Sequence, residues 1–312
     1  WRAGTYRMTS NPNAAIADAH EAIRLVADDP SMEKIQAEAL RCIGLCQNQQ
    51  GKAHQALEWL HQALAISLSI EDKDNAAVIQ LGLGVVYESL GDYTKSMAMY
   101  QAASEHWQRT DNTIWLANLL NNLGVLQHLT GDYRSAILTY EKALQYAHRS
   151  GHNRIEAFVL TGIGDIYVEL NALDEAAIAY QQASVIAQRL HIAVLQAYLY
   201  IQQAMVACGK GNLAECYRLI EDARTIASQE NMTMEVHLSS LEYAGVKVKE
   251  GKASEVVTLL EKECLFFESG GHKVQSEKTH LYLTLAYGQV NNPEMMLKHL
   301  LKILDCLNEQ YK

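Results

Sequence analysis

Small and apolar residues recur along the chain with a fixed period of forty residues. A Leu-Gly or Ile-Gly pair occupies the same phase four times, at Ile43-Gly44, Leu83-Gly84, Leu123-Gly124 and Ile163-Gly164. Similarity repeated at a fixed step of this length is typical of stacked supersecondary units. The period therefore predicts a repeat architecture, in which each repeat packs mainly against its neighbours.

Each repeat divides into two helical patterns. In residues 77–116, apolar positions at helical spacing run as far as Leu90. Gly91 and Asp92 then interrupt the pattern, because the glycine can end a helix with positive φ and the aspartate can cap the next helix. A second helical pattern, centred on Tyr100, completes the repeat. One repeat is therefore expected to be an antiparallel helical hairpin.

The same division extends along the whole chain. The expected fold is all-α, a single right-handed superhelical solenoid over residues 1–312 with about eight antiparallel helix hairpins. Trp1 falls in the middle of a helical pattern, so we expect a truncated first repeat and a piece of a longer protein. The expected repeats lie near residues 1–36, 37–76, 77–116, 117–156, 157–196, 197–236, 237–276 and 277–312.

The glycine of each first helix needs a physical reason. Glycine inside a helix costs about 1 kcal/mol relative to alanine. Since it has no side chain to hold a neighbour apart, we expect the second helix of the hairpin to approach closely at Gly84 and Gly124.

This pattern resembles the tetratricopeptide repeat (TPR). The resemblance rests on the Leu/Ile-Gly pair, the tyrosine three residues later, the Gly-Asp-Tyr turn, and the Ala, Tyr and Ala of the second helix. The period of forty exceeds the family's about 34 residues, which implies longer helices. Arrays with such long repeats are similar to the MalT-like TPR region of bacterial transcription activators and to peptide-sensing regulators. Animal polarity adaptors are also similar, and Asn122-Leu123-Gly124 matches their repeated string once.

Composition narrows the choice of partners. The formal net charge of −10 and the absence of a basic stripe argue against direct contact with nucleic acid. No apolar run is long enough to cross a membrane. The six cysteines form no C-x-x-C pair, so a reducing, cytoplasmic location is expected.

Candidate chemistry is sparse. Neither a phosphate-binding P-loop motif nor an H-E-x-x-H motif occurs, so we expect no catalytic residue, no cofactor and no metal. Cys42 and Cys46 lie one helical turn apart and could offer two metal ligands. No further ligand follows at a matching spacing, and small buried residues are the preferred interpretation.

The TPR resemblance implies that the first helices line a concave groove. Groove positions then include Glu38 and Val78 beside seven candidate binding residues. These candidates are Arg41, Asn118, Asn121, His128, Phe158, Asp165 and Tyr198. The two asparagines lie one turn apart and offer donors and acceptors suited to a peptide backbone or a sugar, and the two aromatic residues could form a stacking floor. The alternative is that all seven are ordinary solvated residues of an inner surface.

These features predict a non-catalytic scaffold that binds a protein, a peptide or a small effector in its groove. The resemblance implies the sensor or interaction region of a larger bacterial transcriptional regulator. A signalling adaptor without a role in transcription is the alternative. Self-association through the C-terminal helix is also expected, since that helix carries the apolar stripe Leu300, Leu301, Leu304 and Leu307.

Overall fold

The computed structural model describes residues 12–27, 29–270 and 272–310. The chain divides into two compact parts, unit 1 (Trp1–Gly162) and unit 2 (Ile163–Lys312), each described by itself. The truncated first helix expected from Trp1 falls on residues 1–11, which lie outside the described residues. The single array expected over residues 1–312 stays a prediction.

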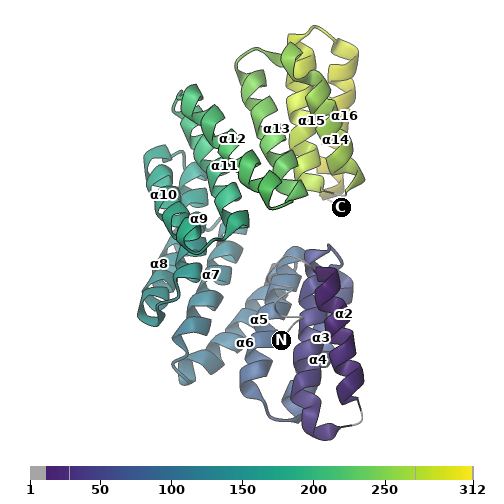
Figure 1. The fold of residues 1–312 in the computed structure, drawn as a ribbon, viewed down its shortest axis with the longest axis vertical. Helices are drawn as coiled ribbons and strands as arrows, with labels where there is room; N and C mark the ends of the chain where they lie inside the picture. Colours follow the sequence, from purple (N-terminus) through teal and green to yellow (C-terminus); the bar gives the residue numbers. More distant parts are fainter. Residues whose placement is uncertain (1–11, 28, 271, 311–312) are drawn as a thin grey trace. The chain divides into compact units, whose positions relative to one another are not determined.

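Unit 1 consists of helices joined by short turns (Figure 1). They are α2 (Pro12–Val26), the 3₁₀ turn η1 (Pro30–Met32), α3 (Glu33–Gln49), α4 (Ala53–Ser69), α5 (Lys73–Ser89), α6 (Tyr93–Arg109), α7 (Thr113–Leu129), α8 (Tyr133–Ser150) and the first part of α9 (Asn153–Glu169). Consecutive helices such as α3, α4 and α5 lie side by side and contact one another.

Unit 2 continues with the remainder of α9 and the same alternation. Its elements are α10 (Leu173–Arg189), α11 (Ala193–Gly209), α12 (Leu213–Gln229), α13 (Thr233–Lys249), the 3₁₀ turn η2 (Ala253–Glu255), α14 (Val257–Ser269), α15 (Lys273–Gln289) and α16 (Pro293–Gln310). Over residues 12–27, 29–270 and 272–310 there is no strand. The predicted all-α fold of TPR-like helical hairpins is confirmed.

The helices keep the forty-residue period but begin earlier than the expected repeat boundaries. Helices α5 and α7 start at Lys73 and Thr113, four residues before the expected boundaries at 77 and 117. The start is set by the preceding turn, where the Asp72 side chain accepts a hydrogen bond from the backbone N–H of Asn75. Most helices have 17 residues, as the longer period implies.

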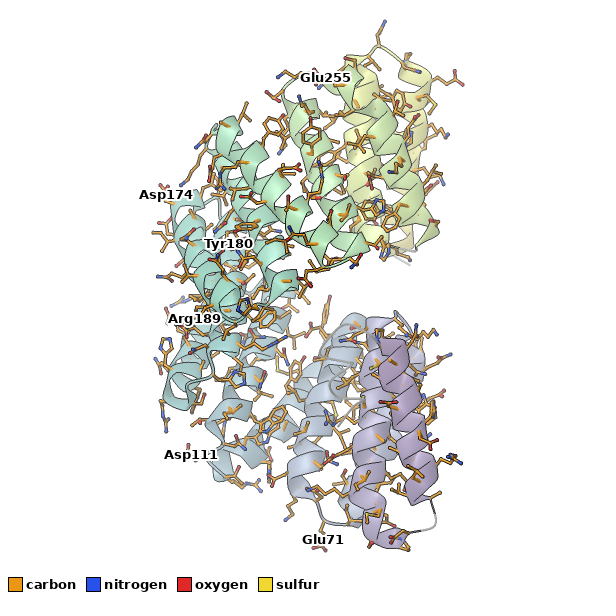
Figure 2. All side chains as sticks on the ribbon, viewed as in Figure 1. Glu71, Asp111, Asp174, Tyr180, Arg189 and Glu255 are labelled. Carbon is orange, nitrogen blue, oxygen red and sulfur yellow. The ribbon has the colours of Figure 1, made fainter. Side chains whose placement is uncertain are left out.

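Residues with positive φ recur every twenty residues, in the turns within hairpins and in the turns between them. They are Gly51, Glu71, Gly91, Asp111, Gly131, Gly151, Asn171, His191, Gly211, Asn231, Gly251 and Asn291. Glu71 and Asp111 lie at the ends of helices in unit 1 (Figure 2). Both kinds of turn therefore use one left-handed residue, which the sequence indicates where that residue is glycine or asparagine.

The first-helix glycines make room for tyrosine rings of the second helix. A Cβ atom added to Gly124 would lie only 2.6 Å from Cδ1 and 2.9 Å from Cζ of Tyr140, whose side chain is fully buried. The same pairing joins Gly84 to Tyr100 and Gly164 to Tyr180. The expected close approach is therefore made by an aromatic side chain.

Repeats without the glycine have a smaller partner. Ala204 stands in the glycine position and Ile220 in the tyrosine position, and Ala244 and Leu260 repeat this exchange. Each of these four residues has at most 1% of its surface exposed. In these two repeats a larger residue in the first helix is thus paired with a smaller one in the second helix. The hairpin of α3 and α4 differs, because Gly44 is paired with Leu60.

Candidate functional site

An open pocket of about 350 Å³ lies across the first helices of unit 1. Helices α3, α5 and α7 contact one another in sequence, and Trp107 of α6 completes the pocket lining. The pocket is lined by Lys34, Glu38, Arg41, Asp74, Asn75, Val78, Trp107, Asn112 and Trp115. Three residues expected in the groove, Glu38, Arg41 and Val78, are therefore brought together.

Charges of both signs surround this pocket. The Lys34 ammonium lies 3.0 Å from an Asp72 carboxylate oxygen, and His106 Nε2 lies 2.6 Å from the Asp74 carboxylate. Partial burial opposes ionisation of Asp72, but the backbone N–H of Asn75 and the Lys34 ammonium hold its pKa below the usual range. A ligand that carries both charge signs, as a peptide does, matches this distribution.

Trp115, which is partly exposed, gives the pocket an aromatic wall, and the fully buried Trp107 holds it in place by stacking. The Trp107 and Trp115 rings are stacked, with centroids 5.2 Å apart and an angle of 11° between their planes. Trp107 is fully buried, in a position that Ser67 and Ala147 occupy in neighbouring repeats. Sequence reasoning missed both tryptophans, although a large residue at a position for small ones was an available signal.

The other candidates on α7 have local partners. Asn118 Nδ2 donates to the Ile114 carbonyl at 3.5 Å, and Asn121 Nδ2 donates to Asn122 Oδ1 at 3.4 Å. Both asparagines are partly buried. These long hydrogen bonds are weak, so the amides can exchange them for a ligand at small cost. His128 instead packs edge-on against Tyr133, with ring centroids 5.7 Å apart.

Asp165 and Tyr198, predicted separately, lie in one hydrogen-bonded cluster of unit 2. Asp165 Oδ1 accepts from the Tyr180 hydroxyl at 2.7 Å and from the Tyr198 hydroxyl at 3.1 Å. Burial, reinforced by the Asp165 charge, raises the pKa of Tyr180, so its hydroxyl stays protonated. Phe158 belongs to unit 1, where the Arg154 guanidinium lies 5.7 Å from its ring centroid.

A second pocket, of about 440 Å³, lies between α10, α11 and α12 in unit 2. Its lining is mostly polar and includes Gln181, Gln188, Tyr200, Gln203, Lys210 and Arg218. Arg218 is bound by carboxylates of its own helix, Glu215 and Asp222. This pocket lies largely on second helices, and sequence reasoning did not anticipate it.

Potential metal ligands occur in two places. Cys42 and Cys46 are buried, which confirms their interpretation as small core residues. A different set, Cys264, His280 and His299, brings three ligand atoms within 4.8 Å of one another. No helix in the described part of the chain has the length and apolar character needed to cross a membrane.

Comparison with known proteins gives one family and a consistent fold. The family described as "MalT-like TPR region" matches residues 65–308. No curated protein matches the chain.

Several solved structures are similar to the chain. The apo form of the quorum sensor NprR from B. thuringiensis is 17% identical with a TM-score of 0.76, over 98% of this chain and 85% of that one. NprR in complex with its cognate peptide NprX has the same identity and coverage, with a TM-score of 0.69. A signal transduction ATPase with a TPR sensor from Pyrococcus horikoshii is 16% identical with a TM-score of 0.64, over 96% of this chain and 48% of that one. At these identities the likeness establishes the fold alone.

Proposed function

The chain belongs to the family of MalT-like TPR regions, and on that premise we propose that it is a non-catalytic scaffold that binds a peptide or a protein segment along its first helices. The observation that carries the proposal is the pocket across α3, α5 and α7, which combines both charge signs with a stacked tryptophan pair. Further support comes from NprR, which has a similar fold and is known in complex with a peptide.

We expect the pocket residues to bind different groups of the ligand. The guanidinium of Arg41 suits a carboxylate of the ligand, because its planar donors match two carboxylate oxygens. The aromatic wall gives a side chain of the peptide an apolar surface. The amides of Asn118 and Asn121 could pair with the peptide backbone further along α7. A small effector with a carboxylate and an apolar group would use the same features.

The wider role that we propose is the sensor region of a bacterial transcriptional regulator. With a net charge of −10, this region would leave DNA contacts to other parts of such a protein. A signalling adaptor without a role in transcription is the second candidate. Sequence next to this region separates the two, since a DNA-binding helix-turn-helix or an ATPase P-loop favours the regulator.

Selection of peptides from a random display library against the purified chain tests the binding role. Selected peptides should bind Arg41→Ala and the double variant Asn118→Ala/Asn121→Ala at least about tenfold more weakly, equivalent to about 1.4 kcal/mol. Arg109→Ala is the matched control, because Arg109 is exposed on a second helix and pairs with Glu105.

Two results would contradict this assignment. Equal affinity of the wild type and both groove variants would remove the pocket across α3, α5 and α7 from the proposal. Loss of binding in Arg218→Ala, with the groove variants unaffected, would place the site in the second pocket. Far-UV circular dichroism checks that each variant remains folded.

We propose in addition that α16 mediates self-association. Four leucines of this helix are between 39% and 53% exposed, namely Leu297, Leu300, Leu301 and Leu304. Clustered exposed leucines are typical of a contact surface. The side chain of Leu307, also part of the expected stripe, lies outside the described residues.

A further inference from the structure

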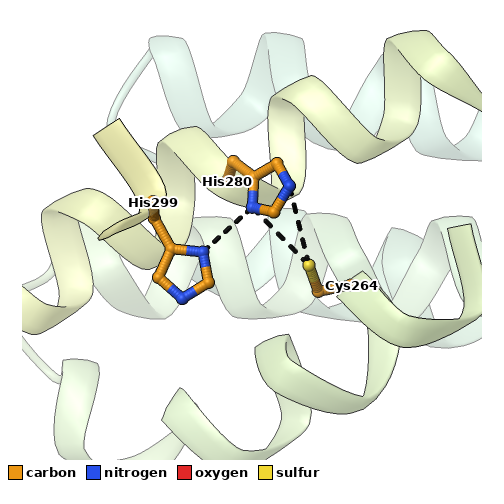
Figure 3. Close-up of side chains that lie close together, drawn as sticks. All are labelled: Cys264, His280 and His299. Atoms are coloured by element: carbon orange, nitrogen blue, oxygen red, sulfur yellow. Dashed lines mark hydrogen bonds between the residues drawn. The ribbon is translucent and has the colours of Figure 1, made fainter. Parts of the chain in front are cut away.

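A cysteine and two histidines from three successive helices meet in the last hairpins of unit 2. Cys264 lies on α14, His280 on α15 and His299 on α16 (Figure 3). All three are buried, with 6%, 3% and 6% of their surfaces exposed. We propose that they form a binding site for a zinc ion.

The distances between the side chains support this assignment. His280 Nδ1 lies 3.6 Å from Cys264 Sγ and 2.9 Å from His299 Nδ1. Tetrahedral zinc, with bonds of about 2.0–2.1 Å to nitrogen and 2.3 Å to sulfur, places neighbouring ligands about 3.6 Å (N to S) and 3.3 Å (N to N) apart. An ion bound to both imidazoles therefore needs them to separate by about 0.4 Å. Cys264 Sγ also lies 4.0 Å from His280 Nε2, so the His280 ring must turn as well for Nδ1 and the thiol to meet at one ion.

A carboxylate holds one of the imidazoles in place. Glu268 Oε1 lies 3.3 Å from His280 Nε2. A zinc-bound histidine commonly donates its second N–H to a carboxylate, which fixes the tautomer and orients the ring. With the proton on Nε2, His280 Nδ1 can act as a ligand atom next to His299 Nδ1, 2.9 Å away. Glu268 is thus a positioning residue for the site.

Burial has opposite consequences for the two kinds of ligand. It lowers the pKa of both histidines, so the imidazoles are neutral as metal ligands must be. It raises the pKa of Cys264 to about 11, so an ion would have to displace the thiol proton to the solvent. Glu268 and the ammonium groups of Lys298 and Lys302 also act on this cluster. His299 Nε2 is buried without a hydrogen-bond partner.

Both histidines occupy positions that hold leucine in several repeats. His280 takes the place of Leu40, Leu120 and Leu160, although Gln80, Tyr200 and Ser240 also occur there, and His299 takes the place of Leu219 and Leu259. Burying a polar ring in place of leucine is unfavourable unless the ring gains strong bonds. Coordination to a metal supplies such bonds, and one thiolate with two imidazoles is a ligand set that suits zinc.

The ion would act on the part of unit 2 where the repeat is least regular. Helix α14 has 13 residues and follows the 3₁₀ turn η2, whereas α12 has 17 residues. Bonds from one ion to α14, α15 and α16 would join these helices directly. Because a site of this kind forms only in the folded state, binding contributes to folding stability.

Titration of the chelator-treated chain with Co²⁺ and Zn²⁺ tests the proposal. We expect one ion per chain, ligand-field bands typical of tetrahedral Co²⁺, a thiolate-to-cobalt charge-transfer band, and displacement of Co²⁺ by Zn²⁺. Cys264→Ser should abolish the charge-transfer band, and Glu268→Gln should weaken zinc binding by about 10–100-fold. Cys216→Ala is the matched control, because this buried cysteine occupies an alanine position of the repeats, and it should bind as the wild type does.

Native mass spectrometry of the wild type keeps the test independent of variant folding. A mass increase of one zinc ion, lost on treatment with chelator, agrees with the site. The proposal is overturned if the wild type shows no cobalt bands and no bound zinc. It is also overturned if folded Cys264→Ser retains the charge-transfer band or if Cys216→Ala loses it.

Discussion

The glycine–tyrosine pair of the hairpin core can be tested by exchanging it for the pair found in other repeats. Gly124→Ala adds a Cβ atom that overlaps the Tyr140 ring. Tyr140→Ile alone leaves a space beside Gly124. The double variant Gly124→Ala/Tyr140→Ile reproduces the natural combination of Ala204 and Ile220. We therefore expect each single change to destabilise the fold and the second change to compensate partly for the first.

The magnitudes follow from the contacts. Alanine gains about 1 kcal/mol of helix propensity over glycine, while overpacking a core costs about 1–3 kcal/mol. Three atoms of the fully buried Tyr140 ring lie within 2.9 Å of the added Cβ, so we take the upper value and expect a net loss of about 2 kcal/mol. For a unit of this size such a loss lowers the melting temperature by about 4–8 °C. Tyr140→Ile should cost about 2–3 kcal/mol for the lost ring contacts.

Urea unfolding, followed by far-UV circular dichroism, measures the free energy of unfolding of the wild type, the two single variants and the double variant. The double variant should be more stable than the sum of the single changes by about 2 kcal/mol, within the range for residues in contact. Gly288→Ala is the control, because its added Cβ meets only Met296 Sδ at 3.5 Å, and it should stabilise the chain by about 0.5–1 kcal/mol. Strictly additive effects, or a Gly124→Ala variant as stable as Gly288→Ala, would refute the packing argument.

Three further outcomes are expected. Burial raises the pKa of Glu88, partly offset by the hydrogen bond from the Tyr100 hydroxyl. Between the unfolded value of about 4.3 and the raised folded value, the folded state binds more protons, so stability falls as pH rises through that window; Glu88→Gln should flatten this part of a stability–pH curve. His191→Gly should stabilise the chain by about 1 kcal/mol in thermal unfolding, because His191 has positive φ, whereas Gly151→Ala should destabilise it by a similar amount. Leu301→Glu should lower the sedimentation coefficient at high protein concentration if α16 mediates self-association, and an unchanged coefficient for an associating wild type would exclude that face.

Much of the fold could be predicted because its packing landmarks are close together in sequence. Gly124 and Tyr140 belong to one hairpin, so a single repeat contains both partners of the contact. The first residues of the helices were harder to predict, since turns such as those at Glu71 and Asp111 place non-glycine residues at positive φ. Glutamate does not indicate a left-handed conformation, and aspartate indicates it only weakly.

The candidate site was predictable only in part. Arg41 could be predicted as a pocket residue, because residues at equivalent positions of successive first helices lie on the same side of the repeats. The aromatic wall was missed, since Trp107 comes from a second helix and reaches the pocket only through its size. The cluster around His280 was missed for a related reason, because its members come from three helices and share no motif in the sequence.

The spacing of the turns has a consequence for how such a chain can change its length. Positive-φ residues recur every twenty residues, alike within and between hairpins, so the backbone accepts a cut at any turn. Loss or gain of forty residues leaves every later helix in its original role. Loss of twenty residues would preserve each turn but would exchange the first and second helices from that point onward. The glycines of the first helices would then lie at positions where the tyrosines of the second helices pack. Recombination can therefore lengthen or shorten the chain by whole hairpins of forty residues. Insertion or deletion of a single helix would disrupt the packing of every later hairpin.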